Sequence, residues 1–168
     1  MPRTFEKEHG PGKVLYAWWS SLDDDRAGRA VLRRAPDITA VTLTAPYQRL
    51  HRRLSAAGWT KTWRNDALAA AVGLLAHVRS EAVVPSSVAA SMSAAAKGGE
   101  SPEVSELRFT RLLESRDLDT LFAVLRRALP LIGHGVDVLA LANDVVEWGD
   151  RVKKDWAYSY NWPAKSDR

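Results

Sequence analysis

Apolar residues recur along much of the chain at intervals of three and four, which is the spacing of helices that bury one face. The clearest case ends where Pro130 interrupts the pattern. Its apolar positions follow the 3.6-residue period and are Leu118, Leu121, Phe122, Leu125 and Leu129. Either Asp117 or Asp119 can start this helix, because an aspartate side chain accepts hydrogen bonds from the free N–H groups of a first turn.

A second helix is predicted immediately before this one. Ser101 and Pro102 indicate its start, since serine caps helices and proline tolerates the first helical position. Its apolar face consists of Leu107, Phe109, Leu112 and Leu113. The two helices together predict a hairpin with an apolar seam and an arginine edge.

The same spacing predicts further helices over residues 13–21, 26–35, 46–57, 65–80 and 137–160. The aspartate run from Asp23 to Asp25 precedes the second of these. A metal site is one interpretation of the run, but capping the positive start of the following helix is the simpler one.

Three segments depart from the helical pattern. Residues 1–12 are polar and broken by Pro and Gly, which predicts a flexible N-terminal arm. Residues 37–45 are rich in β-branched side chains but have no partner strand in the sequence, so we expect an extended connection. Residues 83–100 are rich in Ser and Ala, which predicts a linker or a weak helix between two flexible ends.

These elements predict an all-α fold, a bundle of about six helices in a single domain over residues 13–162. An arrangement of two helical halves joined by residues 83–100 is compatible with the same pattern. A length of 168 residues suits one domain with a substantial core.

Composition narrows the chemistry. The chain has no Cys, which excludes disulfides, thiol catalysis and cysteine metal sites. No apolar run approaches the ~18 residues of a membrane helix, and the first residues lack the apolar core of a signal peptide. We therefore expect a cytoplasmic protein that contacts no membrane.

Most of the 24 Lys and Arg residues are arginines, although the net charge is only +4. The planar guanidinium group binds phosphate through two hydrogen bonds. Helical spacing places several of these arginines in two basic stripes, one made of Arg26, Arg29 and Arg33 and the other of Arg49, Arg52 and Arg53. Such a stripe indicates either phosphate binding or simply a solvated helix face.

An aromatic and basic turn follows the second stripe and contains Trp59, Lys61, Trp63 and Arg64. This combination can stack bases and hold phosphates, or the tryptophans can anchor the core. No metalloprotease, serine hydrolase, phosphate-loop or dinucleotide-binding motif is present, and the four His residues lack ligand spacing. We expect no enzymatic activity, no cofactor and no metal.

The order of several segments resembles the CasB family, the small subunit of the type I-E CRISPR surveillance complex Cascade. The matching segments are Leu15 to Trp18, Arg29 to Arg34, Arg108 to Leu113, Leu125 to Arg127, and the terminal positions Asp144, Trp148, Lys153, Lys154 and Trp156. The resemblance covers almost the whole chain and is most specific in RFTRLL, LRRAL and VKKDWA.

This resemblance implies an all-α, non-catalytic subunit that occurs as two copies beside the backbone and large subunits of Cascade. It implies binding to the nucleic-acid backbone, steadying the CRISPR guide RNA with its target strand and the displaced DNA strand. The phosphate contacts that it implies are Arg33, Arg34, Arg64, Arg108, Arg111, Arg126, Arg127, Arg151 and Lys154. Arg26, Arg29, Arg49, Arg52 and Arg53 are further candidates that rest on helical spacing.

Two other functions fit the same sequence. In a helical protein-interaction scaffold, the arginines would pair with the 20 acidic residues and the tryptophans would bind a partner. In a free-standing regulator, a helix would read duplex DNA, but no short helix-turn-helix with a readable recognition helix stands out.

Overall fold

The structure is a computed structural model that describes residues 3–82, 87–94 and 101–165. Its elements in chain order are α1 (Gly10–Ser21), α2 (Arg26–Arg34), α3 (Ile38–Thr42), α4 (Ala45–Ala56), η1 (Thr62–Arg64), α5 (Asn65–Leu75), β1 (Ser80–Glu81), α6 (Val88–Ser93), α7 (Glu106–Leu113), α8 (Leu118–Ala128), η2 (Leu129–Ile132), β2 (Gly135–Val136), α9 (Val138–Val146) and α10 (Asp150–Ser159), where η marks a 3₁₀ helix. The predicted all-α class is confirmed. None of the described helices is long and apolar enough to cross a bilayer.

Most helices begin at a Ser, Thr or Asp whose side chain accepts a hydrogen bond from the N–H group three residues further on. These capping residues are Asp25, Asp37, Thr44, Ser87, Ser105, Asp117 and Asp137. Asp117 therefore starts α8, and Asp25 has the capping role predicted for the aspartate run.

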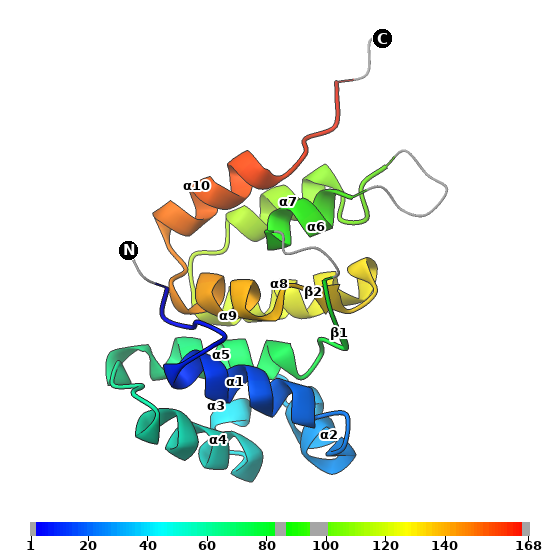
Figure 1. The fold of residues 1–168 in the computed structure, drawn as a ribbon. Coiled ribbons are helices and arrows are strands. Elements are labelled where there is room, and N and C mark those ends of the chain that lie inside the picture. Colours follow the sequence, from blue (N-terminus) through cyan, green and yellow to red (C-terminus); the bar gives the residue numbers. More distant parts are fainter. Residues whose placement is uncertain (1–2, 83–86, 95–100, 166–168) are drawn as a thin grey trace.

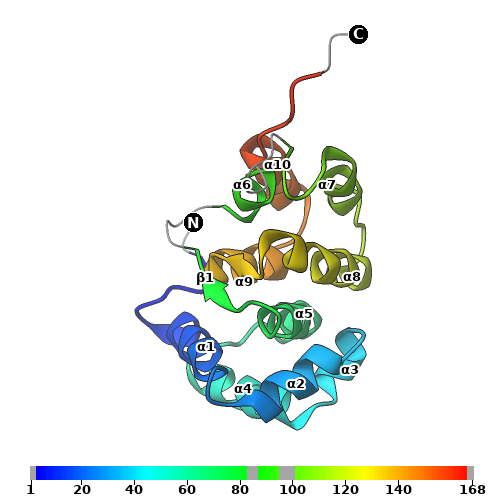
Figure 2. The ribbon, with the colours of Figure 1, turned by 90° about the vertical axis from the view of Figure 1, so that its right-hand side faces the viewer.

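Figure 1 shows the helices in three tiers, and the view turned by 90° in Figure 2 shows the same order. The lower tier contains α1 to α4, the middle tier α5, α8 and α9, and the upper tier α6, α7 and α10. Within the middle tier α5 packs against α8 and α9, and its other side packs against α3. Helix α5 is therefore covered from both sides.

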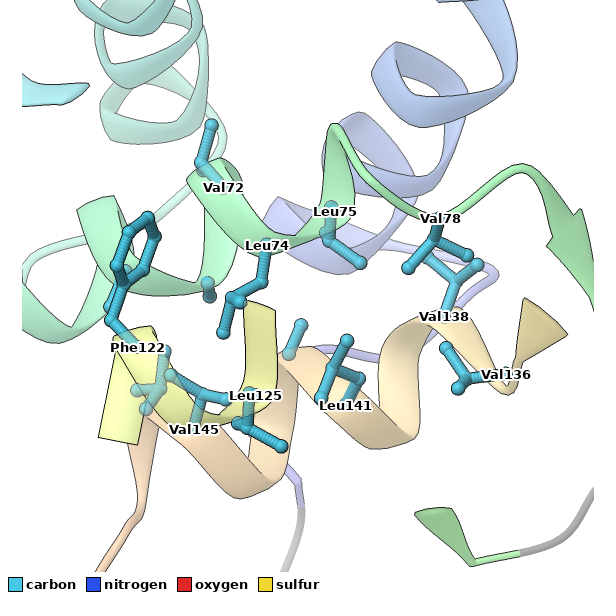
Figure 3. Packing of buried hydrophobic residues seen from close by; sticks show 14 of the residues in the cluster. Val72, Leu74, Leu75, Val78, Phe122, Leu125, Val136, Val138, Leu141 and Val145 are labelled. Carbon is cyan, nitrogen blue, oxygen red and sulfur yellow. The ribbon is translucent and has the colours of Figure 1, made fainter. Parts of the chain in front are cut away.

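The core is built around α5, in which every residue from Ala67 to Leu75 is buried. Most of its side chains are small, and Gly73 has none. A Cβ atom at Gly73 would lie 2.8 Å from side-chain atoms of both Phe122 and Val41, so only glycine permits this separation of α3, α5 and α8. Figure 3 shows Phe122 among the aliphatic side chains where α8 and α9 meet α5.

The β-branched segment predicted as an extended connection instead forms α3. Asp37 caps it by accepting a hydrogen bond from the Ala40 N–H group at 2.8 Å. Ile38 and Val41 are buried, because they face α5. Burial here outweighs the modest cost of β-branched residues in a helix.

The single helix predicted over residues 137–160 is two helices, α9 in the middle tier and α10 in the upper tier. The apolar period continues across the break, and Val152 and Trp156 are buried like Val145. The backbone turns at residues 147–149, where the Trp148 indole N–H donates to the Ser115 carbonyl at 3.3 Å.

Two short segments in which no strand was predicted form a small parallel sheet. Ser80 pairs with Gly135 and Glu81 with Val136. Helix α5 accordingly ends at Leu75, five residues before its predicted end. The sheet ties the end of α5 to the segment that leads into α9.

The predicted flexible arm is instead fixed to the core at Thr4 and Phe5, and residues 1–2 lie outside the described residues. Phe5 is buried, and its N–H group donates to the Asn143 amide oxygen at 2.9 Å. The Asn143 amide nitrogen donates to the Phe5 carbonyl at 3.0 Å, and the Phe5 ring stacks on Trp59. The first helix therefore begins at Gly10 rather than Lys13.

The segment over residues 83–100 contains α6, which agrees with the weak-helix alternative rather than with a linker alone. Val88, Ala89 and Met92 are buried, and α6 packs against α10. Residues 83–86 and 95–100, where flexible ends were predicted, lie outside the described residues.

Helix α7 starts directly after its capping residue Ser105 rather than at Ser101. Phe109 and Leu112 are in the core, but Leu107 is 60% exposed, against the prediction. Two residues along a helix separate Leu107 from Phe109 by about 200°, so the two side chains lie on opposite faces. Helices α7 and α8 do contact each other, as expected of a hairpin.

We predict that Phe122→Ala lowers the free energy of unfolding by about 3 to 5 kcal/mol, because the ring is fully buried against Gly73 and would leave a cavity. Leu43→Ala is the matched control, since Leu43 is 79% exposed and should change stability by less than about 0.5 kcal/mol. Urea denaturation followed by circular dichroism measures both. Equal losses in the two variants would contradict the central position of α5.

Candidate nucleic-acid interface

Several arginines line one hollow at the end of the bundle that carries α2, and this end faces the viewer in Figure 2. Along one flank of α2, three predicted arginines line a hollow of about 370 Å³. The lining residues are Leu22, Asp23, Arg26, Arg29, Ala30, Arg33 and Arg79. We call this site the α2 pocket. It confirms that the basic stripe predicted from helical spacing lies on one face.

Arg29 is the fixed cation of the α2 pocket. Its side chain is only 14% exposed, and one guanidinium nitrogen lies 3.3 Å from a carboxylate oxygen of Asp23. A second nitrogen lies 3.5 Å from the Val78 carbonyl. Its Nε–H group is buried and has no hydrogen-bond partner among the described residues. The positive charge is therefore held in place in the lining of the α2 pocket, and one of its N–H donors is unused in the described part of the chain.

Arg126 lies close to the α2 pocket but is tied to the backbone. Its guanidinium group donates to the Arg33 carbonyl at 2.7 Å and to the Ala35 carbonyl at 3.1 Å. These carbonyls belong to the end of α2, whose last C=O groups have no partner within the helix. Arg126 therefore does not lie free on the predicted arginine edge of the hairpin, whereas its neighbour Arg127 is exposed.

The pKa of His77 reflects the concentration of positive charge at this end of the bundle. Burial, followed by the positive charges of Arg126 and Arg33 and an electrostatic interaction with His134, lowers the pKa of His77 to about 4. The His77 carbonyl contacts the His134 ring nitrogen at 2.9 Å, which links the end of α5 to the segment before β2. The histidine is therefore neutral at pH 7, in a region of positive potential.

Arg64 lies at the opposite end, where it also binds the backbone. It donates to the Val146 carbonyl at 2.7 Å and to Glu147 at 2.9 Å. Lys61 approaches the same carboxylate at 3.5 Å. Burial alone would raise the pKa of Glu147, but the Thr4 hydroxyl and the charges of Arg64 and Lys61 lower it on balance.

The other predicted cations are exposed and spread over several elements. They are Arg34 on α2, Arg49, Arg52 and Arg53 on α4, Arg108 and Arg111 on α7, Arg127 on α8, and Arg151 and Lys154 on α10. Arg49 and Arg53 line a second hollow of about 440 Å³ between α2 and α4. Arg151 pairs with Asp155 at 3.4 Å. The fold thus brings together part of the predicted set and leaves the rest apart.

Sequence reasoning did not include Arg79 in the site. It was placed within the helix predicted over residues 65–80, but it follows the end of α5, where its N–H group donates to the His134 carbonyl at 2.8 Å. Its position depends on that non-local bond, and no local period could have indicated it. In the described part of the chain, no three His, Cys, Asp or Glu residues are grouped as a metal site requires.

Comparison with known proteins identifies the family. The model of the family described as CRISPR-associated protein Cse2 matches residues 28–160. The chain belongs to the Cse2 family. This confirms the resemblance found from the sequence, because CasB and Cse2 denote the same family.

A solved structure supports the Cse2 fold. A chain in the crystal structure of E. coli Cascade bound to a PAM-containing dsDNA target is 19% identical. The match covers 87% of this chain and 91% of that chain, with a TM-score of 0.64. No curated protein sequence matches this chain. At this identity the structural match supports the shared fold, and the family assignment comes from the Cse2 model.

We predict that Arg126→Ala destabilises this Cse2 protein by about 1 to 3 kcal/mol, because it leaves the carbonyls of Arg33 and Ala35 without their donor. Arg127→Ala removes the same charge from an exposed neighbour and should change stability by less than about 0.5 kcal/mol. Thermal melting of the two variants gives the comparison. Similar melting temperatures would show that Arg126 has no structural role.

We predict that stability falls as the pH drops from about 6.5 towards 4. The pKa of His77 is about 4 in the folded protein against an ordinary value of 6.5, so the unfolded chain binds more protons in this window. Arg126→Lys, which keeps the cation, should preserve the low midpoint of His77, whereas Arg126→Ala should raise it. NMR titration of the His77 ring reads both values. A midpoint near 6.5 in the native protein would contradict the described environment.

Proposed function

We propose that this chain is a non-catalytic nucleic-acid-binding subunit of a CRISPR RNA-guided surveillance complex. In this role it stabilises the guide RNA, the target strand and the displaced DNA strand through contacts with their phosphates. The observation that carries the proposal is the α2 pocket in a member of the Cse2 family, where four arginines meet one aspartate. The related fold in E. coli Cascade bound to dsDNA supports the same context.

The α2 pocket suits phosphate better than bases. Arginine forks bind phosphate oxygens without reading sequence, whereas sequence is read when an arginine pairs with a guanine edge or an Asn or Gln pairs with an adenine edge. The described residues that line the pocket include neither Asn nor Gln. Arg29 is already fixed by Asp23, so little side-chain entropy is lost when a phosphate binds.

The exposed cations outside the α2 pocket extend the proposed contact surface. The cations on α4 border the other flank of α2, and further exposed cations are spread over α7, α8 and α10. A long, distributed set of cations fits several strands better than one compact ligand. In the assembly that we propose, two copies of the chain lie beside the backbone and large subunits, and a separate recruited nuclease cleaves DNA.

The alternative function is a helical scaffold whose arginines serve the fold. Arg64 and Arg126 favour it, because each binds backbone carbonyls of another element. Arg26 does not, because it is exposed beside Arg29 and Arg33 and forms no ion pair among the described residues. The two functions therefore differ in what the open cations of the α2 pocket bind.

We predict that the double variant Arg26→Ala and Arg33→Ala weakens binding of single-stranded RNA and DNA without altering the helical signal. Each phosphate contact removed should reduce the slope of log K against log salt by about 0.7. Fluorescence anisotropy at several salt concentrations gives both affinity and slope.

The matched control is Arg116→Ala with Lys165→Ala, which removes the same charge from exposed positions outside the candidate set. It should leave the slope nearly unchanged. Scrambled oligonucleotides of equal length should bind within about tenfold of one another, because the contacts are to backbone. A slope that is identical in the α2-pocket variant and in the wild type would refute the proposed contacts and favour the scaffold.

A further inference from the structure

Trp63 is exposed in a chain that buries most of its tryptophans. Its exposed fraction is 75%, whereas Trp59, four residues earlier, is 3% exposed and stacks on Phe5. The predicted aromatic turn thus contains one core anchor and one ring that faces solvent. A large exposed indole loses much unfavourable contact with water when a partner covers it, which is why tryptophan is enriched among binding hot spots.

The turn that carries Trp63 is held rigidly by Asn65 on one side. The Asn65 side-chain oxygen accepts from the Trp59 indole N–H group at 3.0 Å and contacts the His51 ring nitrogen at 3.1 Å. The Tyr47 hydroxyl donates to the Asn65 carbonyl at 3.3 Å. These bonds fix the junction between η1 and α5.

The other side of the turn is held by Glu147 at the junction of α9 and α10. Arg64 and Lys61, the charged neighbours of Trp63, both bind this carboxylate. Lys61 also donates to the Thr4 hydroxyl at 3.1 Å. The indole is therefore presented by a preorganised backbone, which lowers the entropy lost on docking.

Charge around Trp63 is balanced. Lys61 and Arg64 are matched by Asp66 and Glu147. Next to the turn is a hollow of about 610 Å³, whose charged lining also balances because it comprises Arg3, Lys61 and Arg151 with Asp144, Glu147 and Asp155. Figure 1 shows the connections α4–α5 and α9–α10 at the same end of the bundle, opposite β1 and β2.

This balance argues against nucleic acid at Trp63. Proteins that stack single-stranded bases combine exposed aromatic rings with a surplus of cations that track the phosphates. The α2 pocket has such a surplus, but the cations beside Trp63 are already bound to Glu147. A central aromatic ring surrounded by paired charges of both signs is typical of a protein interface.

We infer that Trp63 is the anchor of a protein-docking surface. Its occupant is a protein subunit of the same surveillance complex that offers an uncharged apolar slot for the indole and charges of both signs around it. This inference rests on the proposed function for the identity of the complex. It places this protein-docking surface at the end of the bundle opposite the α2 pocket.

The test is binding of the purified chain to the remaining subunits of its own CRISPR complex, assembled on guide RNA without it. Trp63→Ala should weaken this binding at least tenfold, while Trp63→Phe, which keeps an aromatic ring, should weaken it less. Tyr158→Ala is the matched control, because Tyr158 is an exposed aromatic residue on α10. Biolayer interferometry measures the affinities, and circular dichroism checks the fold. If Trp63→Ala unfolds, Trp63→Arg serves in its place, since it puts a charge into the proposed slot.

A second arm measures binding of free single-stranded oligonucleotides. Trp63→Ala should bind them like the wild type, and a loss there as large as the loss of subunit binding would reassign the ring to base stacking and overturn the inference. Unchanged subunit binding, or a wild-type chain that does not join the subunits, would also overturn it. Failure of nucleic-acid binding by the wild type would count against the proposed function alone, because the subunit arm is read independently.

Discussion

Helix α5 has apolar or small side chains on every side, so no face of it can be left to water. The lower tier covers one side through α3, and α8 and α9 cover the other. Because Gly73 lies against both Phe122 and Val41, the separation of these layers is set by the absence of one side chain. The chain must therefore return across α5 after building the lower tier, and this return places α8 and the end of α2 side by side.

Two arginines illustrate how the tiers are joined once α5 is covered. Arg126 reaches from α8 to the end of α2, and Arg64 reaches from η1 to the end of α9. Each satisfies carbonyl groups that a helix cannot satisfy itself. Guanidinium groups suit this task because they carry several donors in one plane. The arginine content of the chain thus supports the fold as well as the charged surface, and neighbouring arginines in the sequence can have different roles.

The sequence predicted most of what is decided locally. Helix caps such as Asp25 and Asp117, and the stripe of Arg26, Arg29 and Arg33, follow from spacing within one or two turns. Contacts that join distant segments were missed.

Residues 38–42 became helical because α5 buries Ile38 and Val41, and nothing in their own composition indicates that partner. The break between α9 and α10 was hidden because the apolar period continues through it. Arg79 lies in the α2 pocket, and the Arg126 side chain is fixed, because each forms hydrogen bonds with backbone carbonyls more than 50 residues away.

The pairing of Phe5 with Asn143 has a consequence for how the chain folds as it is synthesised. The two residues are 138 positions apart. At the usual pace of about 5 to 20 residues per second, roughly 7 to 28 s separate their emergence from the ribosome. Throughout that interval the Phe5 backbone lacks its native partner, and α5, once it has emerged, lacks the complete cover of α8 and α9 until the interval ends. The lower tier must therefore keep an apolar surface exposed to solvent until α8 and α9 have emerged. The last third of the chain thus completes the packing of the first part.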